Sequence, residues 1–555
     1  MALRCVAVAT ASHPARALLF WGSLSRKAVQ IAGSGQVETM PAAEKKKLVA
    51  TADGELGLTM DPSLLRGATA DLLIKNRSEI FSSNVLSQKD LAQLHESTAI
   101  VSFLHDFFSH SWRTARLDKW AALLLYLNAQ AAALAMVATT VLWSLLESFG
   151  VVPRLLVWYY ADRHMMTTGM PVLVGLASGI FFLVHWQRIR SFFGLSPRYC
   201  FLDKVCIDQV DDARKAAGIA SLGAFLGSAE NFVVLFSPDY FSRLWCCYEL
   251  AAFRHLQVAG KQKITFLPLA FPRVLFANAV AIVAMCLPYA FIPIFGPWFG
   301  ADTNAITYTF INIMSTPGAL LCMWTMYECQ RYVDARDMID EQLENFSITK
   351  TECHDEKDRP RVEREIAKWF GDGDRAEGIR KFDQYVKTDV RELIEDMVGK
   401  RKPFSASIPW LYIFVSSAGA ILLDLVDFAT FYLLPTWRDQ LYAIVEGASC
   451  ILVGTPMVPV IFLWCSSKQC RFGGKAPMIL LAPIIMQIPQ CLLITGTLSN
   501  DFTFCMVQFF CFTLPIGAVV FRDSIANLLG LKKQGRKAPK KQYVQLPTHS
   551  YGSNL

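Results

Sequence analysis

Glu249 is the residue of this sequence best placed to do chemistry. It lies on a predicted helix, Ser242–Leu256, that follows an apolar strand at Asn231–Phe236 and a polar turn at Ser237–Asp239. A helix that begins just after a buried strand presents its first turns near the carboxyl end of that strand. Parallel sheets bind ligands beyond this end, and Glu249 is the carboxylate on the helix that follows.

The elements that must position Glu249 alternate between strand and helix. Short apolar runs rich in β-branched and aromatic residues predict strands, and apolar residues at spacings of three and four predict helices. The predicted order is strand Ala99–Trp112, helix Arg113–Asn128, strand Tyr199–Cys206, helix Asp211–Gly227, strand Asn231–Phe236, helix Ser242–Leu256 and strand Lys263–Leu269. This order predicts a parallel sheet covered by helices. Its carboxyl edge would bring together Ser109–Trp112, Asp203–Asp208 and Ser237–Tyr240.

One segment carries a recognisable spacing of polar and aromatic residues, SPDYFSRLWCCYELAAF. Its members are Ser237, Tyr240, Ser242, Trp245, Cys246, Glu249 and Leu250. The spacing resembles the signature of the Toll/interleukin receptor (TIR) family, most closely its plant-type members. The upstream DKVCIDQVD is similar to a motif of fungal heterokaryon-incompatibility domains. The resemblance covers about 120 residues, roughly a fifth of the chain.

The resemblance implies a flavodoxin-like α/β domain that assembles with copies of itself and, in members that hydrolyse NAD, a catalytic glutamate at Glu249. A carboxylate held near the ribose would stabilise the positive charge that develops as nicotinamide departs. NAD would be a substrate, and no cofactor or metal is expected. The residues expected to bind it are Ser109, His110, Trp112, Asp203, Ser237, Tyr240 and Trp245. Alternatively the domain is an inert assembly module in which Glu249 pairs with Arg243 or Arg254.

The composition predicts a membrane protein, because 53% of the residues are hydrophobic and only 18% are charged. Runs long enough to cross ~30 Å of hydrocarbon number eight. They are Ala129–Leu146, Gly169–Trp186, Val274–Phe295, Ile306–Met326, Ile408–Phe431, Leu441–Trp464, Met478–Leu498 and Phe502–Phe521. The fold class expected is therefore a polytopic helical membrane protein with a TIR-like parallel-sheet domain.

Lys and Arg concentrate in the loop 465–475 and in the tail after residue 524, which places both termini and the α/β domain in the cytosol. The first 37 residues lack acids, which fits an organelle transit peptide or a disordered leader. The predicted organisation is a leader and linker at 1–97, a split α/β domain at 98–128 and 187–272, a two-span hairpin at 129–186, spans at 273–327, a charged helical region at 328–405, spans at 406–524 and a basic tail at 525–555.

A second set of acids points to a different function. Asp424 and Asp427 lie three residues apart in the fifth predicted span, and Glu446 begins the sixth. Carboxylates inside a membrane are costly and often functional, so these three predict an ion or proton site. Alternatively, the fifth span ends near Leu423 and the acids lie at the membrane interface with Arg438 as their partner. Three functions remain open. The first is a membrane signalling protein that self-associates and hydrolyses NAD, the second is a transporter or channel with a regulatory domain, and the third is a catalytically inert membrane scaffold. The partners expected are the bilayer and a second copy of the chain, with no nucleic acid.

The charged region contains one amphipathic helix after the GDGD turn at Gly371–Asp374. Its apolar residues are Ile379, Phe382, Val386, Val390, Leu393 and Met397. They repeat at spacings of three and four, so they form one stripe that needs a partner. The predicted partner is the neighbouring helix, with Val362, Ile366 and Trp369, or the α/β domain.

Overall fold

A computed structural model describes the arrangement of most of the chain. The described residues are 58, 60–81, 87–153, 157–160, 165–256, 262–295, 304–371, 373–398 and 410–430, with a few short stretches between 437 and 482. The predicted leader, the basic tail and nearly all of the last three predicted spans lie outside these residues.

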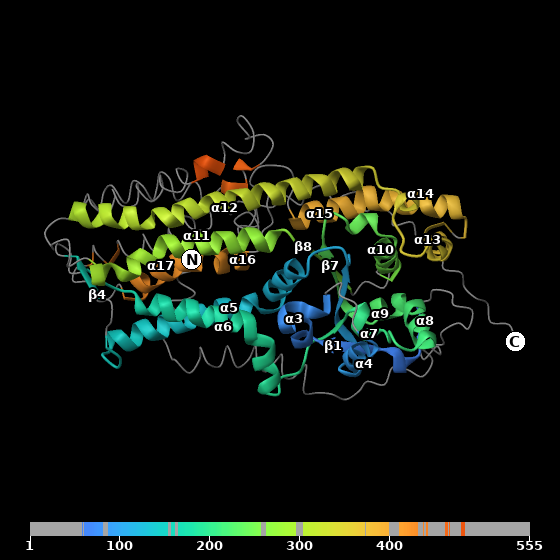
Figure 1. Ribbon diagram of the computed structural model, residues 1–555, viewed down its shortest axis with the longest axis horizontal. Helices are drawn as coiled ribbons and strands as arrows, with labels where there is room; N and C mark the ends of the chain where they lie inside the picture. Colours follow the sequence, from blue (N-terminus) through green and yellow to red (C-terminus); the bar gives the residue numbers. More distant parts are fainter. Residues whose placement is uncertain are drawn as a thin grey trace.

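A six-stranded, largely parallel sheet forms the core of the α/β domain (Figure 1). Its order is β2-β1-β6-β3-β7-β8. The strands are β1 Arg66–Thr69, β2 Ala99–Ile100, β3 Leu104–His110, β6 Tyr199–Phe201, β7 Ala229–Phe236 and β8 Lys263–Pro268. The last four are mutually parallel, whereas β1 runs antiparallel to both of its neighbours. The four predicted strands are therefore present, in one parallel set.

Residues 60–97 differ from the predicted linker. They contribute β1, which pairs with β2 and β6, and Ala68 and Leu73 are fully buried in the main core. Thr69 accepts a hydrogen bond from the backbone N–H of Leu72 and so caps the following helix. Ser87 and Asp90 form a capping box at the next helix. The domain thus begins about 40 residues before the first strand that the apolar pattern predicts.

Helices cover both faces of the sheet and connect its strands. Those of the domain are α3 Ala70–Ser78, α4 Gln88–Glu96, α7 Asp203–Cys206, α8 Asp212–Ala220, α9 Leu222–Gly227 and α10 Leu244–Leu256, with 3-10 turns η1 Pro62–Leu64, η2 Glu79–Phe81 and η3 Tyr240–Ser242. The predicted helix Asp211–Gly227 is divided into α8 and α9 at Ser221. Asp211 caps α8 by accepting from two backbone N–H groups. The predicted strand Tyr199–Cys206 ends at Phe201, and Asp203 begins α7.

The crossover from β3 to β6 is a long helical hairpin, formed by α5 Arg116–Ser148 and α6 Met170–Phe192. The first turns of α5 pack on the sheet through Leu123 and Leu124. From about Ala129 onward α5 extends away from the sheet beside α6. Gly175 and Gly179 allow the close approach, because a Cβ at Gly179 would lie 2.1 Å from Met136. A small antiparallel pair, β4 Val157–Tyr160 and β5 Met165–Thr168, lies between the two helices.

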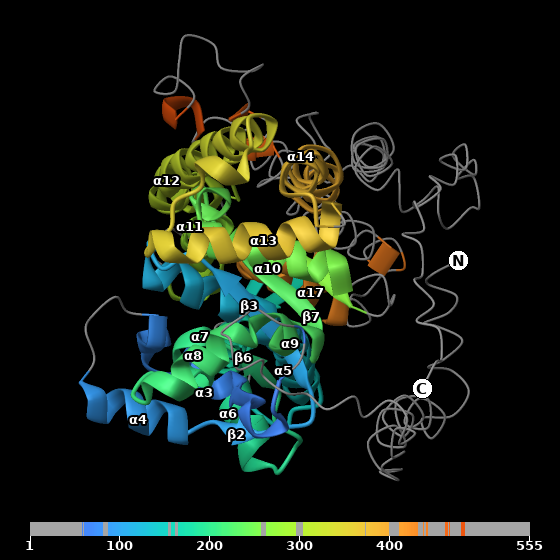
Figure 2. The same cartoon turned by 90° about the vertical axis from the view of Figure 1, so that its right-hand side faces the viewer.

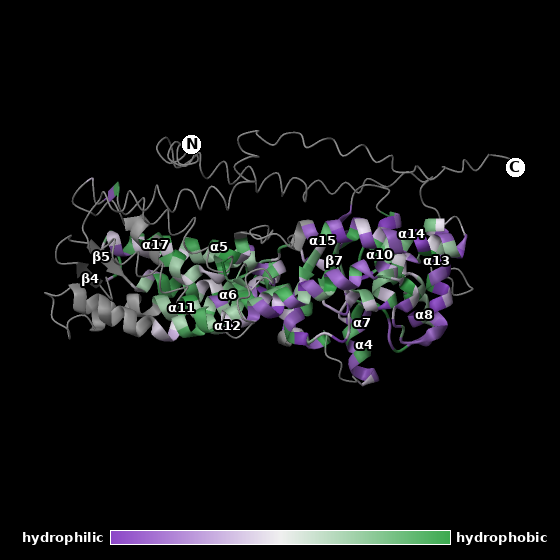
Figure 3. Cartoon of the chain, turned by 90° about the horizontal axis from the view of Figure 1, so that it is seen from above, coloured by the Kyte–Doolittle hydropathy of each residue, from purple (hydrophilic) through white to green (hydrophobic). Residues whose placement is uncertain are grey.

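The rest of the helices extend the hairpin into a bundle and flank the sheet. They are α11 Phe271–Phe295, α12 Asn304–Glu344, α13 Arg359–Gly371, α14 Arg375–Tyr385, a π-helical turn Val386–Val390, α15 Arg391–Val398, α16 Trp410–Ser416 and α17 Ala418–Thr430, with 3-10 turns η6 Ile348–Lys350 and η7 Glu356–Asp358. One end of the molecule is apolar and the α/β end is polar (Figure 3). The apolar end contains α5, α6, α11, α12 and α17.

The prediction of about eight membrane spans is wrong. In the described residues two helices, α5 and α6, are long and apolar enough to cross a membrane. The predicted fifth span, Ile408–Phe431, contains α16 and α17, which are 7 and 13 residues long. The start of α11 is apolar, yet Val274 and Ala277 are fully buried by protein. A helix packed inside a bundle has the same hydropathy as a membrane span, so apolar length alone overcounts spans.

The apolar stripe of the amphipathic helix predicted after the GDGD turn is buried against other parts of the protein. Phe382, Val386 and Val390 are fully buried, and Phe382 contacts Phe346 and Phe370. The helix is interrupted by the π-helical turn at Val386–Val390. In Figure 2, α13 lies across α10 of the α/β domain. The charged region is therefore built onto the sheet domain.

Candidate functional site

The candidate site lies at the carboxyl edge of β3, β6 and β7. Because β3 lies between β6 and β7, the loops after these three strands meet there. The chain crosses from one side of β3 to the other between β6 and β7, which makes this edge the topological switch point of the sheet. The hydroxyl groups of Ser109 and Tyr240 form a hydrogen bond of 2.7 Å, and the indole N–H of Trp112 donates a hydrogen bond of 3.0 Å to the carboxylate of Asp203. The structure thus brings these predicted residues together.

Glu249 reaches this edge from α10. The helix is fixed by buried residues on its sheet side, among them Leu250 and Ala251. The residue is half-buried, but its Oε2 atom is shielded from solvent and has no hydrogen-bond partner within the described structure. Burial raises the pKa of Glu249 to about 8, a hydrogen bond from Ser109 opposes the rise, and Asp203 adds to it. Glu249 is therefore protonated at neutral pH in this arrangement.

Asp239 organises the loop after β7. Its carboxylate accepts hydrogen bonds from Ser111, from Ser237 at 2.7 Å and from Thr114 at 3.3 Å. Burial alone would raise the pKa of Asp239, but the hydroxyl groups hold it below its usual value. Asp239 thus fastens the loop after β3 to the loop after β7. The sequence pattern placed Asp239 in a turn and indicated no role for it.

Lys119 is the residue of the site that the sequence did not predict. It lies in the first turn of α5 and is fully buried, and its Nζ has no hydrogen-bond partner in the described residues. The Nζ lies 5.3 Å from the ring centroid of Phe81 and 5.4 Å from that of Trp112. Burial lowers the pKa of Lys119 to about 8, against the attraction of Asp203 and Asp239. A buried cation thus lies beside the predicted acids.

His110 completes this aromatic cluster. Its ring lies 4.5 Å from Trp112 and 5.1 Å from Phe81, and its Nε2 has no partner among the described residues. Burial, reinforced by Lys119, lowers the pKa of His110 well below its usual value. The imidazole is therefore neutral at physiological pH. It is available as a hydrogen-bonding group and is not a cation.

Two further predicted residues have more limited places in the site. Ser237 contacts Asp239, as described above. Trp245 turns away from Asp203: its indole N–H donates to Asp358 at 3.2 Å, and its ring lies 5.5 Å from Tyr248. Trp245 therefore belongs to the contact between α10 and the charged region.

No protein-family model, curated protein or solved structure matches the chain. The part of the chain that is described contains no group of three or more His, Cys, Asp or Glu side chains that could hold a metal ion.

A buried ion pair stabilises the sheet below the site. Asp106, in the middle of β3, has a fully buried side chain and forms a bidentate pair with Arg198. Tyr126 and Asn231 also donate to Asp106, at 2.9 and 3.2 Å. Both carboxylate oxygens of Asp106 are thus engaged inside the protein, so this acid holds β3, β6 and β7 together. It lies away from the carboxyl edge.

The second predicted acidic site is left undecided. Asp424 and Asp427 lie on α17, but their side chains lie outside the described residues, as does the whole of Glu446. The possible ion site therefore stays a prediction.

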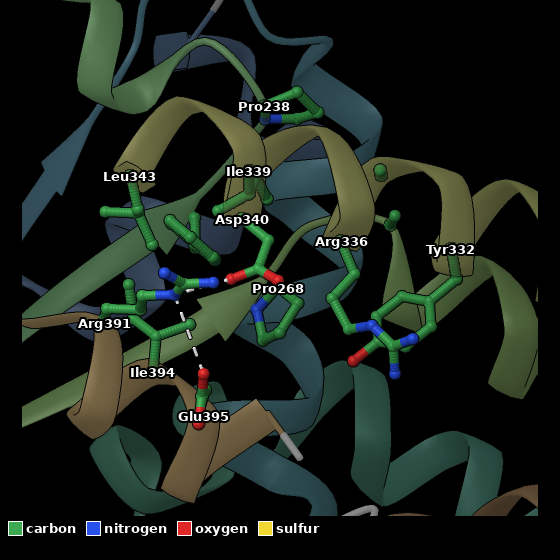
Figure 4. A pocket seen from close by; sticks show the side chains of 13 residues that line it. Pro238, Pro268, Tyr332, Arg336, Ile339, Asp340, Leu343, Arg391, Ile394 and Glu395 are labelled. Atoms are coloured by element: carbon green, nitrogen blue, oxygen red, sulfur yellow. Dashed lines mark hydrogen bonds and ion pairs between the residues drawn. The ribbon is translucent and has the colours of Figure 1, made fainter. Parts of the chain in front are cut away.

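A separate cavity of about 50 Å³ lies at the ends of β7 and β8, between α12 and α15 (Figure 4). Apolar side chains such as Leu343 and Ile394 line it. Arg391 joins its two helices by pairing with Asp340 of α12 at 3.1 Å and with Glu395 at 3.7 Å. The space is large enough for a few water molecules. Arg336, which also lines the cavity, pairs with Asp337 outside it at 3.6 Å, and its Nε has no hydrogen-bond partner among the described residues.

Proposed function

We propose that the α/β domain binds a nucleotide of the NAD type at its carboxyl edge and hydrolyses the bond between nicotinamide and ribose. One observation carries this proposal: the unpartnered, shielded Oε2 of Glu249 beside Ser109 at the switch point of a parallel sheet. A shielded carboxyl oxygen without a hydrogen-bond partner, on an acid whose pKa is strongly raised, is typical of a functional site. The TIR-like spacing around Glu249 supports the same assignment.

The reaction needs little from the protein beyond a placed carboxylate. The bond from ribose C1′ to the pyridinium nitrogen breaks, and the electron pair leaves with nicotinamide. Water adds to C1′ and loses a proton, which gives ADP-ribose, nicotinamide and H⁺. The carboxylate of Glu249 would stabilise the oxocarbenium-like ribose between these steps. Ser109, one hydrogen bond away from Glu249, would orient it.

Glu249 must lose its proton to act in this way. The positive pyridinium of a bound substrate would lower the pKa of the acid, because an opposite charge nearby favours the ionised form. Turnover should therefore rise with pH up to the pKa of Glu249, which is about 8 in the empty site. This rising limb is the signature of the proposed mechanism.

The test is nicotinamide release from NAD by the full-length protein and by its Glu249→Gln variant. We expect turnover in the wild type and a loss of about 100-fold or more in the variant. Glu96→Gln, which changes an exposed acid at the end of α4, is the matched control. Equal turnover in all three proteins, or none in the wild type at any pH from about 6 to 9, would refute the proposal.

We propose also that α5 from residue 129 onward and α6 cross a bilayer as a hairpin, with the α/β domain on the cytosolic side. The support is that large apolar side chains are exposed along both helices. Leu134, Leu142, Ile180 and Phe181 are each more than half exposed. Arg188 and Arg190 follow the apolar part of α6, which favours the cytosolic side for that end.

Membrane insertion is tested by extraction at alkaline pH. The wild type should stay in the membrane pellet. A variant with Leu142→Lys and Ile180→Lys should move to the supernatant, because a charge in the middle of a span costs about 3 kcal/mol. Release of the wild type by carbonate would contradict the proposal.

Self-association of the α/β domain is the last part of the proposal. Ile100, on the edge strand β2, and Phe103 are 62% and 45% exposed. An exposed apolar edge strand is a ready contact for a second copy of the chain. Chemical cross-linking of the wild type and of Ile100→Lys tests it, and an unchanged yield of dimer would exclude this edge.

A further inference from the structure

Two loops at the carboxyl edge of the sheet each contribute an arginine that forms an ion pair with Glu352. Arg113 follows β3, and Arg243 precedes α10. Their guanidinium groups lie 2.6 and 3.8 Å from one oxygen of Glu352. Glu352 comes from another part of the chain, the segment 347–358 between α12 and α13, which is called the strap here. The strap therefore places an anion between two cations at the candidate site.

The strap is fastened mainly by its backbone. The N–H of Glu352 donates to the carbonyl of Ser242 at 2.6 Å, and the N–H of Leu244 donates to the carbonyl of Glu352 at 3.0 Å. Asp358, at the far end of the strap, accepts from Trp245. The Glu352 side chain can therefore be changed without removing the hydrogen bonds that hold the strap against η3 and α10.

The two arginines have the properties of a site for an anion. Guanidinium groups bind phosphate oxygens in pairs, and these two come from different loops at the switch point. Asp239, the other acid of these loops, is engaged by three hydroxyl groups. The side chains of Arg113 and Glu352 are 58% and 50% exposed. Ion pairs this exposed contribute little free energy, so an external anion can displace Glu352.

We infer that Arg113 and Arg243 form a binding site for the phosphate or pyrophosphate group of a ligand, and that Glu352 occupies this site as an internal competitor. The identification of the pyrophosphate as that of NAD rests on the proposed function. The anion site itself does not, because it is defined by the two arginines and the strap. Binding of the ligand then requires the Glu352 carboxylate to leave.

The test compares binding of inorganic pyrophosphate by the full-length wild type and its Glu352→Gln variant, measured by titration calorimetry. Removing the competing charge should tighten binding about two- to fivefold. Glu356→Gln is the matched control, since Glu356 lies on the same strap and pairs with Arg359 instead. Equal affinities in wild type and Glu352→Gln, or the same gain in Glu356→Gln, would overturn the inference.

A measurement on the unchanged protein keeps the inference testable if the variant does not fold. Pyrophosphate should slow the modification of Arg113 by phenylglyoxal and leave that of Arg380, an exposed arginine paired with Glu377, unchanged. Equal modification of Arg113 with and without pyrophosphate would overturn the inference. Parallel titrations with NAD and with vesicles that contain a phosphoinositide identify the source of the anion. Because binding is measured apart from turnover, a chain that binds pyrophosphate but releases no nicotinamide refutes the proposed function alone.

Discussion

Replacing Glu249 by glutamine should change how stability depends on pH. In the folded protein the pKa of Glu249 is about 8, whereas the ordinary value is 4.5. Between these two values the unfolded chain has lost a proton that the folded chain keeps. Stability of the wild type therefore falls as pH rises through this window, by about 1.4 kcal/mol per pH unit. The glutamine side chain of the Glu249→Gln variant cannot titrate, so this contribution to the slope disappears.

The size of the effect follows from the two pKa values. From about pH 5 to about pH 7, ionisation of Glu249 in the unfolded chain costs the wild type about 2.5 kcal/mol of unfolding free energy relative to the variant. With an m-value of about 2.5 kcal/mol per M, the urea midpoints of the two proteins should separate by about 1 M over this range. The variant becomes the more stable protein towards higher pH.

The assay is urea unfolding of both full-length proteins at about pH 5, 6 and 7, followed by tryptophan fluorescence. Glu96→Gln serves as the control and should follow the wild type, because Glu96 is exposed. Parallel curves for wild type and Glu249→Gln would refute the reasoning. They would mean that Glu249 is already ionised in the folded protein, and that the acid has a partner or open access to water.

Three further predictions concern other parts of the domain. Arg198→Leu leaves the buried charge of Asp106 unpaired and should cost about 3–5 kcal/mol of stability in urea unfolding. Lys119→Met removes a buried cation whose pKa is lowered to about 8, so it should stabilise the protein by up to about 3 kcal/mol near pH 7, and less towards pH 10, in thermal melts. Gly378→Ala puts a Cβ 2.6 Å from the Cα of Ala367 and should speed hydrogen exchange in α13 and α14.

The parallel part of the sheet could be predicted because its strands are buried on both faces. β7 ends in the apolar run Phe232–Phe236, and the buried positions of β3 and β8 include Leu104, Phe107, Phe108, Ile264, Phe266 and Leu267, which is close to the pattern of a covered parallel sheet. β1 escaped prediction because its sequence, Arg-Gly-Ala-Thr, has no large apolar residue. A glycine is needed there, since a Cβ at Gly67 would lie 3.0 Å from the Cβ of Tyr199. Only the tertiary contact reveals such a strand.

Two acids of the site, Asp203 and Glu249, could be read from the sequence, whereas the role of Asp239 and the buried cation could not. Strand ends locate Asp203 and Ser237, and a motif locates Glu249. Lys119 belongs to the first turn of a helix, where a lysine is normally solvated, and nothing local indicates that η2 covers it. Glu352 is over 100 residues away from the arginines that it pairs with. Sequence patterns that describe one element at a time cannot show such pairings.

Helix α5 is a single unbroken helix of 33 residues that connects the candidate site with the apolar end of the molecule. At 1.5 Å per residue it is about 50 Å long. Lys119 lies at one end, and the apolar hairpin lies at the other. Arg273 of α11 donates two hydrogen bonds, of 2.6 and 2.7 Å, to the carboxylate of Asp118, and these fix the first turn of α5 near the site. A tilt of about 5° about this point moves the far end by about 4 Å and the site end by only a fraction of this. The same tilt moves Lys119, one residue from Asp118, by only about 0.1 Å, so the pair of Arg273 with Asp118 fixes the end of α5 that bears the buried amine.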